Sequence, residues 1–142
     1  MEQEIVNYLE TQRVGVLAVE MPDGSPHAAT VHFAHSNEPL LFYFETRRDS
    51  RKAQALLGRN VTRATFVIGS DESSMKTFQL DGLIEVLKDD EKGTFDSVYL
   101  AKFPEKKEKS YDPQFIFFKF MPTWWRFTDW KAPHGKKILT SE

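Results

Sequence analysis

The stretch that decides the fold is residues 41–53, LFYFETRRDSRKA. Its first half, up to Thr46, is rich in aromatic residues and predicts a β-strand. In its second half, Asp49 or Ser50 can cap a helix N-terminus, and apolar residues then recur at helical spacing until Gly58 ends the pattern. The stretch therefore predicts a strand that leads directly into a short helix with a basic first turn.

That first turn holds Ser50, Arg51 and Lys52. A helix N-terminus attracts anions such as phosphate and disfavours basic side chains, because its N–H groups are unpaired and it carries partial positive charge. A bound phosphate would resolve the conflict, with Arg51 as a bidentate donor and Lys52 as a compact charge. Arg47 and Arg48 would add to the positive field. On these residues alone, a solvated basic cluster beside a surface helix remains the alternative.

The remainder of the chain predicts a mainly β domain with short helices. The helices are expected over residues 2–12, 50–57 and 89–102, and the strands over residues 14–19, 27–35, 40–46, 61–68 and 77–86, followed by a hairpin of residues 115–121 and 124–130 around Pro122. Short turns join most strands, so the sheet should be antiparallel. Closure into a Greek-key-like barrel of six to seven strands would remove its exposed edges. We assign residues 1–130 to this single domain and residues 131–142 to a loosely held C-terminal tail.

Composition excludes several classes of function. A net charge of -2 argues against a general nucleic-acid binder, and no apolar run is long enough to span a membrane. The chain has no cysteine, which excludes disulfides and thiolate metal sites. The acidic N-terminus does not resemble a signal peptide, so we expect a cytoplasmic protein. The 12 Phe, 4 Tyr and 3 Trp suit an aromatic core, a pocket for a flat ligand or an oligomer interface, and composition does not choose among them.

Single residues give weaker indications. His32 and His35 would point to opposite faces of a strand, so we expect no metal site there. His32 is a candidate neutral donor in a pocket, with a packed or surface role as the alternative. Glu45 and Asp81 are isolated carboxylates on strands, without a neighbour that suggests an acid–base pair. Residues 124–126, Trp-Trp-Arg, could stack on a flat ring or belong to the core or a dimer interface.

The order of elements and these motifs together resemble the pyridoxamine 5'-phosphate oxidase-like family, most closely its short general stress protein branch. The likeness begins with residues 41–53, continues through residues 56–61, and includes residues 76–85 with their glycine. It covers roughly residues 3–130. The family fold is the flavin mononucleotide (FMN)-binding split barrel, usually a homodimer with two flavins in clefts between the subunits.

The resemblance implies a set of cofactor-binding residues. By position they are Thr30, Val31, His32, Phe33, Glu45, Thr46, Ser50, Arg51, Lys52, Thr77 and Trp125. Arg51 and Lys52 would bind the FMN phosphate, and residues 30–33 would run beside the isoalloxazine ring with their backbone. Glu45 and Thr46 match a strand-end pair that touches the flavin. Thr77 would lie near a polar contact to the flavin, and Trp125 would correspond to an aromatic flavin contact that the family has near its C-terminal end.

Departures from the family pattern narrow the expected function. Ala29 and Ala34 stand where the oxidases carry a further phosphate-binding arginine and a lysine, and residues 124–130 lack the basic substrate-binding motif. Pyridoxal phosphate synthesis is therefore not expected. Glu45 replaces an aromatic residue and would lower the affinity for an anionic cofactor.

We therefore expect a homodimeric FMN-binding protein with flavin-dependent oxidoreductase activity on an unknown small molecule, without an identified catalytic residue. The alternative is a non-catalytic flavin- or haem-binding module on the same barrel. A third alternative, stacking on single-stranded nucleic acid, is disfavoured by the acidic charge.

Overall fold

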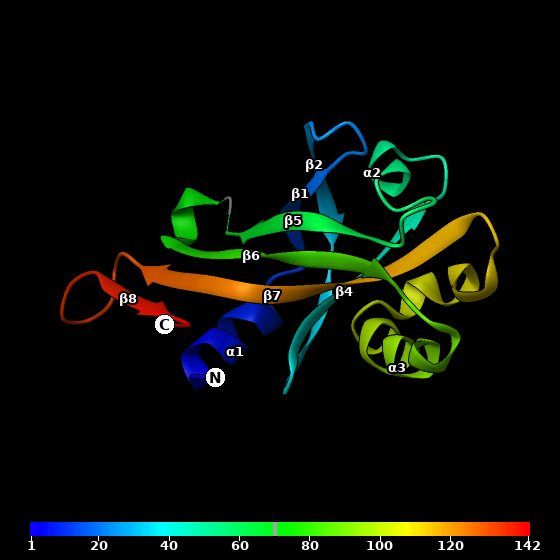
Figure 1. The fold of residues 1–142 in the computed structure, drawn as a ribbon. Coiled ribbons are helices and arrows are strands. Elements are labelled where there is room, and N and C mark those ends of the chain that lie inside the picture. Colours follow the sequence, from blue (N-terminus) through cyan, green and yellow to red (C-terminus); the bar gives the residue numbers. More distant parts are fainter. Residues whose placement is uncertain (70) are drawn as a thin grey trace.

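The architecture was taken from a computed structural model, which describes residues 1–69 and 71–142. Eight strands, three α-helices and three 3₁₀ helices follow one another along these residues (Figure 1). In chain order they are α1 (Gln3–Thr11), β1 (Val14–Glu20), β2 (Pro26–His32), β3 (Ala34–Asn37), β4 (Leu40–Arg47), α2 (Arg51–Gln54), β5 (Val61–Ile68), η1 (Glu72–Ser74), β6 (Lys76–Val86), η2 (Asp89–Glu91), α3 (Lys92–Lys102), η3 (Pro104–Tyr111), β7 (Phe115–Asp129) and β8 (Lys137–Thr140). None of the described helices has the length and apolar character needed to cross a bilayer.

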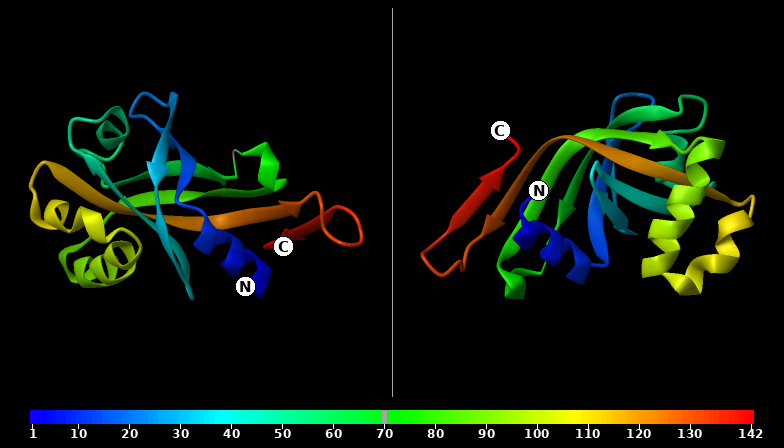
Figure 2. Two further views of the ribbon diagram at one scale, coloured as in Figure 1. Left: turned by 180° about the vertical axis from the view of Figure 1, so that it is seen from behind. Right: turned by 90° about the horizontal axis from the view of Figure 1, so that it is seen from below.

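One curved antiparallel sheet forms the framework (Figure 2). Its strand order is β2-β1-β5-β6-β7-β4-β3, with β8 paired to β7. The predicted mainly β, antiparallel barrel of six to seven strands is confirmed. The two edge strands, β2 and β3, are consecutive in the sequence and separated only by Phe33. The chain therefore connects the two edges of the curled sheet directly.

This crossing corrects the prediction of one continuous strand over residues 27–35. β2 pairs with β1, whereas β3 pairs with β4, so the chain changes partner at Phe33. The side chain of Phe33 is fully buried, and its amide donates to the carbonyl of Arg13 at 3.1 Å. An alternating pattern alone does not reveal such a change of partner.

Aromatic side chains fill the barrel. Phe66 is fully buried, and its ring lies 5.2–6.1 Å from the rings of Phe33, Phe42, Phe44 and Phe120. Most of these pairs meet edge to face, the arrangement that aromatic quadrupoles favour. Much of the aromatic content thus serves the core.

A second buried cluster lies on the other face of β4, beneath α3. It consists of Ala34, Tyr43, Phe95, Tyr99 and Phe103. Phe95 and Tyr99 come from the apolar stripe predicted for this helix, and their rings stack with centroids 4.9 Å apart. This packing places α3 and the following η3 against the outer face of β4 (Figure 2).

The predicted hairpin around Pro122 is wrong, because residues 115–129 form the single strand β7. The strand passes Pro122 through a bulge: Gly82 of β6 pairs with Pro122 and Asp81 with Trp124, which leaves Thr123 as the extra residue. A bulge tolerates proline because no ladder hydrogen bond from its nitrogen is required there. A Cβ at Gly82 would lie 2.1 Å from the Met121 carbonyl oxygen, so this close approach requires glycine.

Two further expectations need correction. The helix expected over residues 50–57 is regular only over Arg51–Gln54 and then continues as turns. The tail is not loose over Lys137–Thr140, because these residues form β8 and pair with β7. An ion pair between Lys137 and Glu4 also ties β8 to α1.

Candidate functional site

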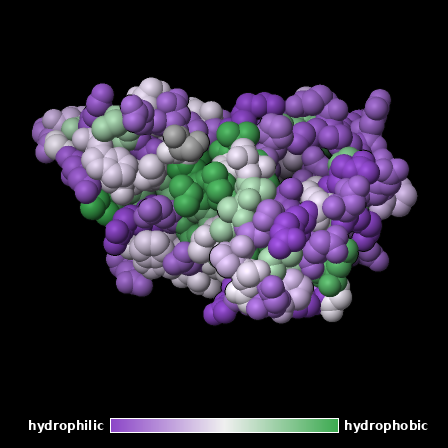
Figure 3. Space-filling model, turned by 90° about the horizontal axis from the view of Figure 1, so that it is seen from above, coloured by the Kyte–Doolittle hydropathy of each residue, from purple (hydrophilic) through white to green (hydrophobic). Residues whose placement is uncertain are grey.

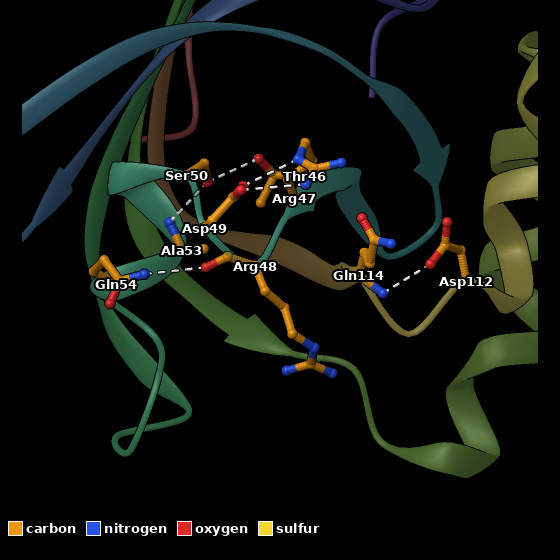
Figure 4. Close-up of polar contacts among 9 residues, drawn as sticks. All are labelled: Thr46, Arg47, Arg48, Asp49, Ser50, Ala53, Gln54, Asp112 and Gln114. Atoms are coloured by element: carbon orange, nitrogen blue, oxygen red, sulfur yellow. Dashed lines mark hydrogen bonds and ion pairs between the residues drawn. The ribbon is translucent and has the colours of Figure 1, made fainter.

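The junction between β4 and α2 carries four cationic side chains: Arg47, Arg48, Arg51 and Lys52. They differ in their partners, and Figure 4 draws Arg47 and Arg48. Arg47 makes two contacts with the Asp49 carboxylate, at 3.1 and 3.2 Å. Arg48 donates from Nε to the Pro113 carbonyl at 2.8 Å, and its amide donates to the carbonyl of Gln114. Arg47 is therefore neutralised locally, and Arg48 holds the loop before β7.

Of the two predicted caps, Asp49 and Ser50, the structure shows that Ser50 caps α2. Its Oγ accepts from the Ala53 amide at 3.3 Å and from the Thr46 hydroxyl at 3.0 Å (Figure 4). Thr46 is only 6% exposed, so the contact fixes the position of Ser50 relative to the sheet. Because Ser50 accepts both bonds, its own hydroxyl hydrogen remains available to a ligand.

The other two cations differ from the arginines upstream. Among the described residues, neither Arg51 nor Lys52 has a hydrogen bond or ion pair through its side chain. Arg51 is exposed, and Lys52 is half-buried. Burial lowers the pKa of the Lys52 amine, and the negative charge of Glu45 partly opposes this effect. A half-buried ammonium without a partner is a favourable place for an anion.

A second polar cluster lies beside these residues, where η3 meets the outer face of β4. The Lys106 ammonium is 2.9 Å from His32 Nδ1, 3.1 Å from Glu45 Oε1 and 3.1 Å from the Tyr99 hydroxyl. The Glu45 and Lys106 side chains are 7% and 12% exposed. Glu45 is thus part of a buried ion pair, which the sequence did not indicate.

The contact with Lys106 defines the state of His32. An ammonium can only donate, so Nδ1 of His32 must accept and the ring proton lies on Nε2. Burial lowers the pKa of His32, with further lowering from the charges of Lys106 and Arg13. His32 nevertheless lies at the protein surface, so its Nε2–H can reach a ligand.

The remaining predicted site residues divide into two groups. Thr30 lies on the exposed outer face of β2, next to His32 along that face, whereas Val31 and Phe33 are buried in the core. Thr77 and Trp125 lie at the far end of the sheet. Thr46 pairs with Ile116 at the start of β7, whereas Thr77 pairs with Thr128 near its end.

The sequence did not indicate Lys106. It occurs in a run of charged residues, Lys106-Lys107-Glu108-Lys109, which predicts a solvated loop. The same segment forms η3, and only Lys106 of these four is partly buried. Its position one turn after the buried Phe103 is the only local signal for its inward orientation. Within residues 1–69 and 71–142, no group of three or more His, Asp or Glu side chains is arranged to hold a metal ion.

An apolar patch covers part of the outer face of β1, β5 and β6. Val14, Val67 and Leu83 are each 37–40% exposed there, and Figure 3 shows apolar side chains gathered within polar surroundings. A hollow of about 570 Å³ adjoins it, with Ala18 and Ala64 in its lining.

A family model described as pyridoxamine 5'-phosphate oxidase matches residues 1–129. The chain belongs to the pyridoxamine 5'-phosphate oxidase family. The resemblance seen in residues 41–53 is thereby confirmed, and the split barrel of this family accounts for the curled sheet. No curated protein sequence matches the chain.

Solved structures share the fold at low sequence identity. General stress protein 26 from Bacillus anthracis is 20% identical, with a TM-score of 0.67, over 96% of this chain and 95% of that one. A haem-binding protein from Mycobacterium smegmatis is 18% identical, with a TM-score of 0.71, over 91% of this chain and 53% of that one. The chain therefore spans about half the length of the mycobacterial protein. A haem storage protein from Vibrio cholerae is 18% identical, with a TM-score of 0.66, over 85% of this chain and 89% of that one.

Proposed function

We propose that this member of the pyridoxamine 5'-phosphate oxidase family binds FMN and uses it in the oxidation or reduction of a small molecule. The observation that carries the proposal is the difference among the four cations between β4 and α2. Arg47 and Arg48 are engaged within the protein, whereas Arg51 and Lys52 have no partner among the described residues. Two such cations beside the Ser50 hydroxyl fit a phosphate group.

The chain's own residues would bind and orient the cofactor. Arg51, Lys52 and Ser50 would hold the phosphate, while the outer face of β2, with Thr30 and His32, would lie along the ring. The bound flavin would supply the electron transfer, and the protein would supply position and electrostatics. Glu45 should lower the affinity for the anionic cofactor less than the sequence implies, because the Lys106 ammonium, 3.1 Å away, balances the charge of its carboxylate.

A second copy of the chain would complete the site. Thr77 lies opposite Thr128, whereas the phosphate residues follow Thr46, opposite Ile116. These two pairings are about 40 Å apart along β7, at roughly 3.3 Å per residue. One flavin is shorter than that span, so Thr77 and Arg51 of the same chain would contact different cofactors. We propose a homodimer in which the apolar patch with Leu83 forms part of the interface.

Haem is the second candidate, since two proteins of similar fold are described as haem-binding and haem storage proteins. Ligation of haem iron by His32 requires a free lone pair on a ring nitrogen. Lys106 occupies Nδ1 of His32, and the ring proton occupies Nε2. The local chemistry at His32 therefore favours a hydrogen-bonded ligand over an iron-bound one.

The proposal is tested by titrating the folded protein with FMN and, in parallel, with riboflavin, which lacks the phosphate. We expect Arg51→Ala/Lys52→Ala to weaken FMN binding by about 100-fold, at roughly tenfold for each lost charge-assisted contact. Riboflavin affinity should be unchanged by the same substitutions. Arg47→Ala is the matched control, because that arginine is already paired with Asp49. Folded wild-type protein that does not bind FMN at tens of micromolar would refute the proposal.

The dimer is tested separately by light scattering. Leu83→Glu should convert a dimer into monomers and weaken FMN binding. A wild-type protein that is monomeric with FMN bound would contradict the two-chain site.

A further inference from the structure

Lys106 connects the two strands that are expected to face the cofactor, β2 and β4. Its ammonium reaches His32 at the end of β2 and Glu45 on β4, and the Tyr99 hydroxyl accepts the third contact. The three donors of an ammonium group are thus matched by three acceptors. The ring centroids of Phe103 and Tyr99 lie 5.0 and 5.4 Å from the same nitrogen. At these distances the two rings can stabilise the ammonium of Lys106 in its largely buried position.

The Lys106 ammonium compensates the negative charge of the Glu45 carboxylate. That carboxylate lies near enough to Lys52 for its charge to act on the lysine. Without Lys106, a buried negative charge would stand next to the cations that we assign to the phosphate. Since the side chains of the pair are 7% and 12% exposed, solvent would screen that charge only weakly.

We propose that Lys106 is a positioning residue of the cofactor site, which balances Glu45 and holds His32 with its proton on Nε2. The two strands then present a neutral hydrogen-bond donor to the ligand, and no net negative charge. The ligand in this inference is the FMN of the proposed function. The effect on His32 does not depend on FMN, so the two ideas can be tested apart.

The first experiment measures the tautomer of His32 in the cofactor-free protein. Two-dimensional nitrogen–proton NMR of protein with ¹⁵N-labelled histidine distinguishes a protonated Nε2 from a protonated Nδ1, and His32→Gln identifies the signal among the four histidines. We expect a protonated Nε2 in the wild type and a mixture of tautomers in Lys106→Met. Lys107→Met, a substitution of the exposed neighbour, should leave the wild-type pattern. A wild-type ring protonated on Nδ1 would overturn the inference.

The second experiment measures FMN affinity in a double-mutant cycle. Lys106→Met should weaken binding by at least about tenfold, because it leaves the Glu45 carboxylate uncompensated. Glu45→Gln/Lys106→Met, which removes both charges, should restore the affinity to within about threefold of wild type. Equal affinity of Lys106→Met and wild type, or no recovery in the double variant, would overturn the inference.

The results separate the two hypotheses. Wild-type protein that fails to bind FMN while His32 shows the Lys106-dependent tautomer would remove the proposed cofactor and retain the positioning role. If Lys106→Met does not fold, the wild-type NMR measurement still decides the tautomer, and Glu45→Gln/Lys106→Met supplies the comparison without an unpaired carboxylate.

Discussion

The buried pair of Glu45 and Lys106 should contribute measurably to stability, and Lys106→Met is the most informative perturbation of it. The N–O distance is 3.1 Å, which corresponds to a gross attraction of about 5 kcal/mol at an effective dielectric constant of 20. Desolvation of both groups offsets much of that attraction. Removal of the lysine leaves the carboxylate unpaired and deprives His32 and Tyr99 of a donor. We therefore expect a loss of about 3 kcal/mol in the free energy of unfolding.

The assay is urea unfolding at pH 7, followed by circular dichroism, for wild type, Lys106→Met, Glu45→Gln and the double variant. The coupling energy of the cycle should be about 2 kcal/mol and should change little between low and high salt, because a buried pair is weakly screened. The ion pair of Arg13 and Glu105, at 3.2 Å with side chains 56% and 58% exposed, is the matched control. Its coupling should be below about 0.5 kcal/mol. An equally small coupling for the buried pair would refute the reasoning.

Three further predictions concern other parts of the chain. Gly82→Ala should destabilise the protein by about 2 kcal/mol in thermal unfolding, since its Cβ would meet the Met121 carbonyl oxygen at 2.1 Å; wild-type stability would contradict the assigned bulge. Ser50→Ala should cost about 1 kcal/mol by the same measurement, through loss of the cap to the Ala53 amide, and no change would argue against that cap. Burial lowers the pKa of Lys102 to about 8, below its value in the unfolded chain. The unfolded state then binds more protons between pH 8 and the ordinary lysine pKa near 10.4, so the stability of wild type relative to Lys102→Met should rise over that range. A difference that stays constant or falls with pH would contradict this assignment.

The sequence was sufficient for most elements whose pattern is local. The helix over residues 2–12 and the strand over residues 77–86 were predicted because one face of each carries the apolar residues. The three failures in the sheet, at Phe33, at Pro122 and in β8, depend on the strand with which each segment pairs. Pro122 reads as a turn until Gly82, forty residues earlier, supplies the bulge that accommodates it. β8 could not be predicted because its four residues are too few for a clear alternating pattern, and they form a strand by pairing with β7.

In the candidate site, too, the residues of a local motif could be predicted from the sequence, whereas contacts between distant residues could not. Ser50, Arg51 and Lys52 lie in one local motif, so their cationic character and the cap were predictable. Within the described residues, Arg47 and Arg48 have partners and Arg51 and Lys52 have none through their side chains. Asp49 is a local partner of Arg47, but only the structure brings Arg48 to the carbonyl of Pro113, 65 residues away. Lys106 is 61 residues from Glu45, and no periodicity in the sequence links them.

The uneven distribution of tryptophan along β7 gives the protein a natural optical probe. Trp124 and Trp125 lie in the distal half of the strand, and Trp130 follows its last residue, whereas the residues assigned to phosphate adjoin its beginning. Transfer of excitation energy from an indole to a flavin falls steeply with distance. A cofactor enclosed by one chain would therefore leave much of the tryptophan emission intact. A cofactor shared with the distal end of a neighbouring β7 would quench it, so a single fluorescence spectrum reports how many chains surround the ring.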